Sequence, residues 1–388
     1  MEEKSVVIIG SSSYNTLGVI ESLAEKGVKS HLILLGETNN SFVCKSKYII
    51  KIWECKVEDD VIKCLLGNVN NKQKPVIITT NDNSAGIIDR YYDELIDYYY
   101  IPNAKKQNRI NELMDKKYQA GLAREIGLVC PETWYYEGDD IFDELTFPCI
   151  TKAESSLDGD KSIQQIFHEK ESLMAFINKC GYINLIIQQF IEKEYEFQLI
   201  GCSLNGGDEI IIPGRTHIVR PKSIQNTFYL EFFPCEDRLQ GLLEKVRSFI
   251  KSTGYSGLFS VEFLHDKSGV DYFTEMNFRN DGNSYVVTKS GVNLPFLWYK
   301  EGCGELDKSD YLELQVKAVS FCPEHVYVGS IITHEVGFKE GVKNIKNASC
   351  YGLYFKNDKK PFMYFWYKYI SEIFFEKIKK IFNHGKNR

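Results

Sequence analysis

The chain has 388 residues, 43% hydrophobic and 26% charged, which is typical of an ordinary globular protein with room for two or three domains. The formal net charge of −6 gives no reason to expect a nucleic acid partner. Eleven cysteines without any C-x-x-C spacing favour reduced thiols over a disulfide framework or a zinc site. The start, MEEKSVVIIG, has no signal-peptide pattern, and no run of about 18 apolar residues follows, so we expect a cytoplasmic protein.

The first 100 residues alternate between strand and helix patterns. Strands are predicted over 6–9, 31–35 and 75–80, and helices over 16–26 and 84–92. Such alternation predicts a small, mostly parallel α/β sheet. The turn from Gly10 to Ser13 could bind a phosphate or carboxylate at the start of the first helix. It is not a G-x-G-x-x-G motif, although Glu37 could mimic the ribose-binding acid of a dinucleotide site.

The middle of the chain changes from one long helix to a strand-rich pattern. The helix is predicted over 105–126 and ends at Gly127. Strands are then expected within 147–154, 185–191, 194–204 and 209–215, and helices over 170–179 and 240–253. Two more strands, holding Glu262 and Glu275, are joined by a tight turn at 266–269. The last 90 residues end in an aromatic helix with eight Lys or Arg against two Glu from Lys359 onward.

The most informative stretch is DYFTEMNFRNDGN, in which Glu275, Asn277 and Arg279 are spaced at i, i+2 and i+4. On a β-strand these three side chains share one face. A hard cation such as Mg²⁺ takes one or two carboxylates together with phosphate oxygens, and Glu262 would supply the second carboxylate. The alternative is a solvated strand face with a chance salt bridge.

Five motifs in order resemble those of the ATP-grasp superfamily, most closely its carboxylate–amine ligases. They are VVIIGSS with VIITTNDNSAGIIDRYYDEL, then DKKYQAGLAREIGLVCPETW, FPCITKA, IIQQFIEKEYEF, and FSVEF with TEMNFR. The resemblance covers roughly residues 5–300. It implies an α/β and α+β protein with a parallel N-terminal domain over 1–104, a two-subdomain ATP-grasp region over 105–300, and a C-terminal region over 301–388.

The resemblance also implies a nucleotide site. Lys152 ends an apolar strand, where a buried ammonium needs an anion such as a phosphate, unless it snorkels from the strand end. Lys161 would face the phosphates from a loop with only one glycine, Gly159, so its covering role is open. The hinge, residues 188–191, would hold the adenine. Glu194 and Glu196 are the candidates for holding the ribose, and the similarity of the EYE pattern favours Glu194. The implied nucleotide-binding residues are Lys116, Lys152, Lys161, Gln188, Gln189, Phe190, Ile191, Glu194 and Glu196.

The same resemblance assigns the chemistry. Glu262, Glu275 and Asn277 would hold Mg²⁺, or Mn²⁺ in its place, between the ATP phosphates. Arg279 would stabilise charge on the transferred phosphoryl group. Arg220 would contact a substrate carboxylate or the acyl phosphate, whereas His217 is more simply an ordinary histidine.

The implied activity is an ATP-dependent ligase that activates a carboxylate as an acyl phosphate and joins it to an amine, both small molecules. An ATP-grasp phosphotransferase or carboxylase with another acceptor is the alternative, as is a non-catalytic nucleotide-binding protein. In the C-terminal helix, Ile370, Phe374, Ile378 and Ile381 form one stripe that would pack on the protein or on a second subunit, or rest on anionic lipid. A homodimer is left open.

Overall fold

The computed structural model describes residues 5–69, 73–138, 142–153, 163–181, 185–219, 228–312 and 315–385, with side chains up to Glu372 in the last helix. Lys161 and Arg220 lie outside the described residues, as do the side chains of Phe374, Ile378 and Ile381 in the predicted stripe.

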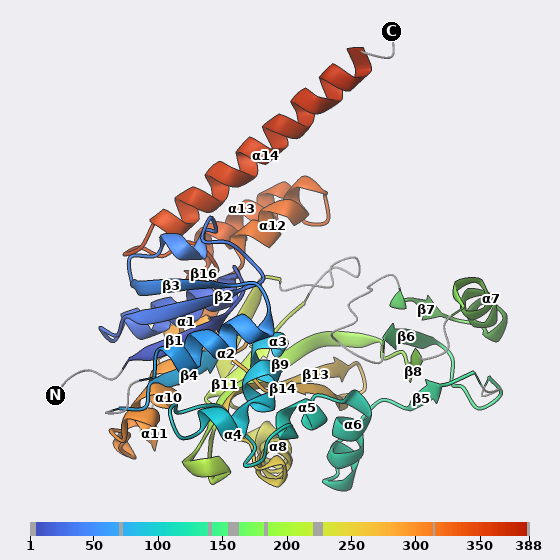
Figure 1. The fold of residues 1–388 in the computed structure, drawn as a ribbon. Helices are drawn as coiled ribbons and strands as arrows, with labels where there is room; N and C mark the ends of the chain where they lie inside the picture. Colours follow the sequence, from blue (N-terminus) through green and yellow to red (C-terminus); the bar gives the residue numbers. More distant parts are fainter. Residues whose placement is uncertain are drawn as a thin grey trace.

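The N-terminal part is a four-stranded parallel sheet, as predicted, with the strand order β3-β2-β1-β4 (Figure 1). Val6 and Ile8 of β1 pack in one hydrophobic cluster with α1 and α10, while Val7 and Ile9 pack in another with α2 and α3. Because both faces are covered, β1 and its neighbours read as continuous apolar runs. The bounds are β1 Val6–Gly10, β2 Ser30–Leu35, β3 Ile49–Cys55, β4 Val76–Thr79, α1 Tyr14–Ala24, α2 Glu58–Gly67, α3 Asp82–Arg90, α4 Tyr92–Leu95 and α10 Leu294–Cys303.

The single helix predicted over 105–126 is wrong, because the structure has two short helices there, α5 (Arg109–Leu113) and α6 (Lys116–Glu125). Asp115 separates them, and its side chain accepts a hydrogen bond from the backbone N–H of Tyr118. That is the N-cap geometry of a new helix start. Gly127 has a φ of +82°, as a residue after a helix end requires.

A small antiparallel sheet follows, with the order β5-β8-β6-β7. The helix α7 (Lys170–Cys180) contributes Leu173 and Ile177 to the hydrophobic cluster that this sheet forms. In Figure 1 this sheet lies at the opposite end of the molecule from the N-terminal sheet. Its strands are β5 Thr133–Tyr136, β6 Cys149–Ala153, β7 Ile166–Phe167 and β8 Leu185–Gln189.

The largest sheet has eight strands in the order β14-β13-β9-β11-β12-β15-β16, with β10 paired to β9. One strand was predicted over 209–215, but Pro213, which has no N–H for a ladder bond, separates β10 from β11. The helix α8 (Gln240–Thr253) has its predicted bounds and packs on one face of this sheet. The strands are β9 Lys193–Leu204, β10 Glu209–Ile211, β11 Gly214–His217, β12 Leu230–Pro234, β13 Gly257–Asp266, β14 Asp271–Asn277, β15 Val319–Cys322 and β16 Cys350–Tyr351.

The C-terminal residues combine those last two strands with helices, and α14 projects far beyond the rest of the molecule (Figure 1). None of the helices in the described ranges is long and apolar enough to cross a membrane. The remaining helices are α9 Ser284–Ser290, α11 Ser309–Leu312, α12 Glu324–Ile332, α13 Phe338–Asn347 and α14 Lys360–Gly385, with short 3₁₀ turns at Val43–Lys45 (η1), Asn205–Gly207 (η3) and Asp237–Leu239 (η4).

Candidate nucleotide and metal site

Three neighbouring strands place the predicted metal ligands side by side. Glu262 of β13 is the register partner of Glu275 on β14 and of Gln198 on β9. Two residues further along each of the strands β13 and β14, Ser260 is opposite Asn277. Because directly opposed residues of an antiparallel pair point to the same face, the five side chains share one polar surface. The pairing of the two acidic strands is as predicted, whereas the sequence did not single out Gln198.

The other face of the same strands is core. Val261, Phe263 and Met276 alternate with the polar residues and are fully or almost fully buried in the hydrophobic cluster formed with α8. The acids therefore stand on a surface whose reverse side is tightly packed, which fixes their spacing.

Glu262 is the most perturbed carboxylate of the site. One of its oxygens accepts hydrogen bonds from Gln198 Nε2 (3.0 Å) and Asn277 Nδ2 (3.2 Å). Burial raises the pKa of Glu262 well above its usual range, and the nearby carboxylates of Glu275 and Asp281 raise it further. A cation between the carboxylates would relieve this repulsion.

The donor set fits Mg²⁺, since two carboxylates and one amide oxygen are hard ligands that leave room for phosphate and water oxygens. Across the described ranges there is no cluster of three or more His, Cys, Asp or Glu side chains that could hold a metal by itself. A cation at Glu262, Glu275 and Asn277 would therefore depend on a bound substrate to complete its shell.

Arg279 does not lie on the strand as predicted, because β14 ends at Asn277 and Arg279 stands in the loop beyond it. Its side chain nevertheless turns back to the site, donating from Nη2 to Asn277 Oδ1 (3.1 Å) and from Nε to Asp82 Oδ1 (3.1 Å). Burial alone would lower the pKa of Arg279, but the carboxylates of Asp82 and Asp281 outweigh it and raise that pKa. Arg279 is a fixed, fully charged cation.

The residue between Asn277 and Arg279 explains why the loop is held so firmly. Phe278 is completely buried in the cluster around α8, with its ring centroid 5.1 Å from that of Tyr255. This aromatic anchor places its two polar neighbours at the site.

Lys116 reaches the acids from the helix α6. Gln119 of this helix donates to the carbonyl of Met276 (3.1 Å) and accepts from its N–H (2.7 Å), so α6 is fixed to the edge strand β14. Three residues earlier on the helix, Lys116 places its Nζ 3.7 Å from Glu275 Oε2. A phosphate bound through a cation at Glu275 would therefore lie within reach of this lysine.

Lys152 faces the same space from the small sheet. Its Nζ donates to Gln188 Oε1 (2.8 Å), and Gln188 Nε2 donates to Thr133 Oγ1 (3.0 Å). Burial, followed by the charge of Lys116, lowers the pKa of Lys152 to about 8. A cation destabilised in this way gains most from an incoming anion.

The predicted adenine hinge connects β8 of the small sheet to β9 of the large sheet. The N–H of Gln189 donates to Glu132 O (2.8 Å), and the N–H of Phe190 donates to Pro148 O (2.9 Å), so both donors are already used. Ile191 is buried and Gln188 and Gln189 are half-buried at this connection.

The two glutamates that follow the hinge differ. Glu194 is exposed, whereas Glu196 is half-buried, forms an ion pair with Lys193, and alternates onto the same face as Gln198. Glu196 therefore stands closer to the polar row that carries Glu262.

His217 lies on the reverse face of the large sheet. Its neighbour Arg215 is opposite Leu199, which belongs to the core, and the His217 ring contacts Tyr195 with centroids 4.4 Å apart. Burial and Arg215 lower the pKa of His217. The structure therefore separates His217 from the polar row, consistent with an ordinary histidine.

The carboxyl edge of the N-terminal sheet closes the other side of the site. Asn15 Nδ2 donates to the carbonyls of Thr80 (2.7 Å) and Asn280 (2.9 Å), and the N–H of Asn280 donates to Thr79 O (3.0 Å). In the turn after β1, the N–H of Ser12 donates to Glu37 Oε1 (3.1 Å). A carboxylate of the protein thus already occupies this turn, where the sequence analysis placed a substrate anion.

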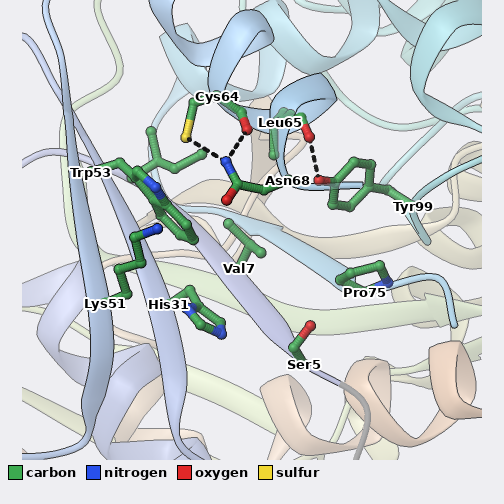
Figure 2. A pocket seen from close by; sticks show the side chains of 11 residues that line it. Ser5, Val7, His31, Lys51, Trp53, Cys64, Leu65, Asn68, Pro75 and Tyr99 are labelled. Atoms are coloured by element: carbon green, nitrogen blue, oxygen red, sulfur yellow. Dashed lines mark hydrogen bonds between the residues drawn. The ribbon is translucent and has the colours of Figure 1, made fainter. Parts of the chain in front are cut away.

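A cavity of about 260 Å³ lies elsewhere, between the N-terminal sheet and α2 (Figure 2). His31, Lys51 and Trp53 face it, and the His31 and Trp53 ring centroids are 5.3 Å apart. None of the predicted site residues lines it.

The chain is similar to known proteins in its structure and not detectably in its sequence. No protein-family model matches the chain, and no curated protein sequence matches it either. Three solved structures illustrate the similarity. An L-amino acid ligase from Bacillus licheniformis has a TM-score of 0.64 at 14% identity, with 82% of this chain and 80% of that chain covered. The ADP complex of PurK, an N5-carboxyaminoimidazole ribonucleotide synthetase, has a TM-score of 0.65 at 14% identity, covering 86% and 84%.

A biotin carboxylase from Campylobacter jejuni, described as a β,γ-ATP complex, has a TM-score of 0.64 at 15% identity, with 82% of this chain and 75% of that chain covered. These three proteins have different activities and one architecture, and at such identities the likeness concerns the fold alone. The protein therefore has the fold of the ATP-grasp enzymes.

Proposed function

We propose that this protein is an ATP-dependent ligase that converts a small-molecule carboxylate into an acyl phosphate and joins it to an amine. The observation that carries the proposal is the row formed by Gln198, Glu262 and Glu275, faced by Lys116 and Lys152. Two carboxylates opposite two lysines suit a metal-bound polyphosphate, because each phosphate oxygen can meet a cation.

The proposed roles follow from the positions of the residues. Glu262, Glu275 and Asn277 hold Mg²⁺, which neutralises the phosphate charges. Lys152 and Lys116 bind phosphate oxygens, and the residues 188–191 and Glu196 border the adenosine. The second substrate enters between Arg279 and the carboxyl edge of the N-terminal sheet, where Arg279 stabilises the transferring phosphoryl group. On this view residues 1–104 and 105–300 form two domains with the site between them.

ATP is required by the chemistry. A free carboxylate is a poor electrophile, and phosphorylation turns one of its oxygens into a leaving group. The amine then attacks the carbonyl carbon and phosphate departs, giving an amide, ADP and phosphate. The one serine among the described residues of the polar row, Ser260, donates its hydroxyl to Asp281 Oδ2 (2.9 Å), and no histidine stands beside it as a base. The proposed path therefore has no covalent enzyme intermediate.

The first test is calorimetric titration of the whole protein with ATP, with and without Mg²⁺. Saturable binding that requires Mg²⁺ would support the site, and a screen of carboxylates paired with amines for ADP release would then identify substrates. Absence of ATP binding under every metal condition would remove the proposal.

Glu275→Gln provides the matched test of the metal assignment, with Glu305→Gln, an exposed glutamate outside the site, as the control. Turnover should collapse in the first variant and persist in the second. Release of ADP in the presence of bicarbonate and without any amine would instead favour a carboxylase. The names of two structural neighbours include this activity. Tight ATP binding without any turnover would favour a regulatory nucleotide-binding protein.

A further inference from the structure

The most exposed apolar side chains of the described residues gather near the C-terminus. Among the side chains that the structure describes, six large apolar ones are more than 60% exposed, and five of these follow residue 330. These five are Ile332, Phe338, Met363, Tyr367 and Ile370. Single exposed apolar residues are normal, but such a concentration indicates an interaction surface.

The helix α14 has two different apolar sides. Phe365 packs on the body of the protein, with its ring centroid 5.4 Å from that of Phe42 and 5.6 Å from that of His325. Met363, Tyr367 and Ile370 are spaced at i, i+4 and i+7, so they form one stripe on a different side of the helix. These three are between 62% and 73% exposed. The side of α14 that carries Phe365 attaches the helix to the protein. The stripe of Met363, Tyr367 and Ile370 is not covered by any of the described residues.

The same part of the molecule is strongly basic. Between Phe338 and Lys368 there are seven lysines and two acids, Glu340 and Asp358. Asp358 is buried and accepts a hydrogen bond from the backbone N–H of Lys47, so it does not offset the lysines at the surface. All seven lysines are exposed: Lys339, Lys343, Lys346, Lys356, Lys359, Lys360 and Lys368.

The charge of the whole chain makes this contrast sharper. The chain has a net charge of −6, and the residues from Lys359 onward carry +6, so the residues before Lys359 carry −12. A basic surface with exposed apolar side chains therefore belongs to an otherwise acidic protein. Figure 1 shows that α14, which bears part of this basic surface, extends away from the rest of the molecule.

We propose that this C-terminal surface, formed by α13, α14 and the end of α12, docks on an anionic lipid membrane. The lysines would lie against lipid phosphates, and the exposed apolar side chains would enter the boundary between headgroups and acyl chains. Tyrosine is suited to this depth because its ring is apolar and its hydroxyl is polar. The proposal does not depend on the ligase activity. It adds that the protein works at a membrane surface.

Two other partners satisfy fewer of these observations. In a dimer through this surface, seven exposed lysines would face the same seven lysines, which like-charge repulsion opposes. A nucleic acid would attract the lysines but would leave Phe338, Met363 and Ile370 without an apolar environment. Only an anionic membrane matches both the charge and the apolar side chains.

The test is co-sedimentation of the full-length protein with vesicles of phosphatidylcholine alone and of phosphatidylcholine with phosphatidylserine. One variant combines Met363→Ser, Tyr367→Ser and Ile370→Ser, and its matched control combines Ile50→Ser and Val57→Ser, which are exposed on the N-terminal part. A second variant combines Lys339→Gln, Lys343→Gln and Lys346→Gln, with Lys29→Gln, Lys56→Gln and Lys63→Gln as its control.

The expected result is binding to phosphatidylserine vesicles that weakens with salt and falls about tenfold or more in both variants, with both controls unchanged. Equal binding to neutral vesicles, or no binding at all, would overturn the proposal. A dimer in analytical ultracentrifugation that the triple-serine variant abolishes would assign the surface to a second copy. Binding to duplex DNA that depends on the lysines and ignores the serine substitutions would assign it to nucleic acid.

Discussion

The side chains of Arg279 and Asp82 are 3.1 Å apart, between Nε and Oδ1, although 197 residues separate them in the chain. Asp82 opens α3 at the carboxyl end of β4, and Arg279 follows the strand that bears Glu275. The pair is largely shielded, since the two side chains are 17% and 29% exposed. The N-terminal sheet thus sets the direction of the cation that we assign to phosphoryl transfer.

Asp82→Asn should lower turnover more than it lowers ATP affinity. Asn277 and Asp281 would still contact Arg279, but a small displacement of a catalytic group costs about 10- to 100-fold in rate. The measurement is kcat and the KM for ATP, with Asp93→Asn at an exposed site of the same sheet region as the control. An unchanged kcat would show that Asp82 does not position Arg279.

Glu262→Gln should lose activity while stabilising the protein without ligands. The folded-state pKa of Glu262 is raised above its value in an unfolded chain, so the stability that protonation provides is present at low pH and is lost as the pH rises through the folded pKa. A glutamine side chain does not ionise, so the variant does not lose this stability as the pH rises. Thermal unfolding from pH 4.5 to 8 should therefore show a midpoint that falls with pH in the wild type and falls less in the variant. Parallel curves would argue against a perturbed Glu262.

ATP binding should weaken above about pH 8 because of Lys152. Its pKa of about 8 means that the free protein carries the charged lysine below this pH and the neutral lysine above it. Binding a phosphate favours the charged form, so above pH 8 binding must take up a proton, and affinity should fall by up to about tenfold per pH unit. Titration at several pH values checks this, and Lys152→Met should bind weakly with little of this dependence. A wild-type affinity that is constant up to pH 10 would contradict the assignment.

Phe278→Ala should destabilise the fold by about 3–5 kcal/mol, since it removes a fully buried ring from a packed core. Denaturant unfolding measures the loss, and the exposed Tyr98→Ala should change stability by less than about 0.5 kcal/mol. Turnover of the folded fraction should also fall, because the neighbours Asn277 and Arg279 lose their anchor. A normal turnover would mean that their own hydrogen bonds suffice.

The shared face of Glu262, Glu275 and Asn277 could be predicted from the sequence because strand geometry is local. The i, i+2 spacing of Glu275 and Asn277 fixes a shared face, and the tight turn at 266–269 makes β13 and β14 neighbours. Gln198 could not be found in this way, since its position beside Glu262 depends on the register of β9, which no turn connects directly to β13. Asp82 was out of reach for the same reason, as only the packing of two sheets brings it to Arg279.

The sequence contains a local capping signal at the start of α6. The Asp115-Lys116 pair marks a helix start, because an aspartate before a helical run accepts the first backbone N–H groups, yet a single helix was predicted there. The edge strand β3 was missed since its residues Ile50, Lys51 and Glu54 are exposed and mixed in character, which hides a strand from a search for apolar runs.

The burial of the last strands of the large sheet against the first strand affects how the chain folds during its synthesis on the ribosome. Phe321 of β15 and Leu353 after β16 are fully buried in the same hydrophobic cluster as Val6 and Ile8 of the first strand. At roughly 5–20 residues per second, the ribosome adds Leu353 about 20 to 70 s after Val6. Throughout that interval the inner side of the first strand lacks part of its cover, so a nascent chain stopped before residue 350 would expose apolar surface and become a target for chaperones.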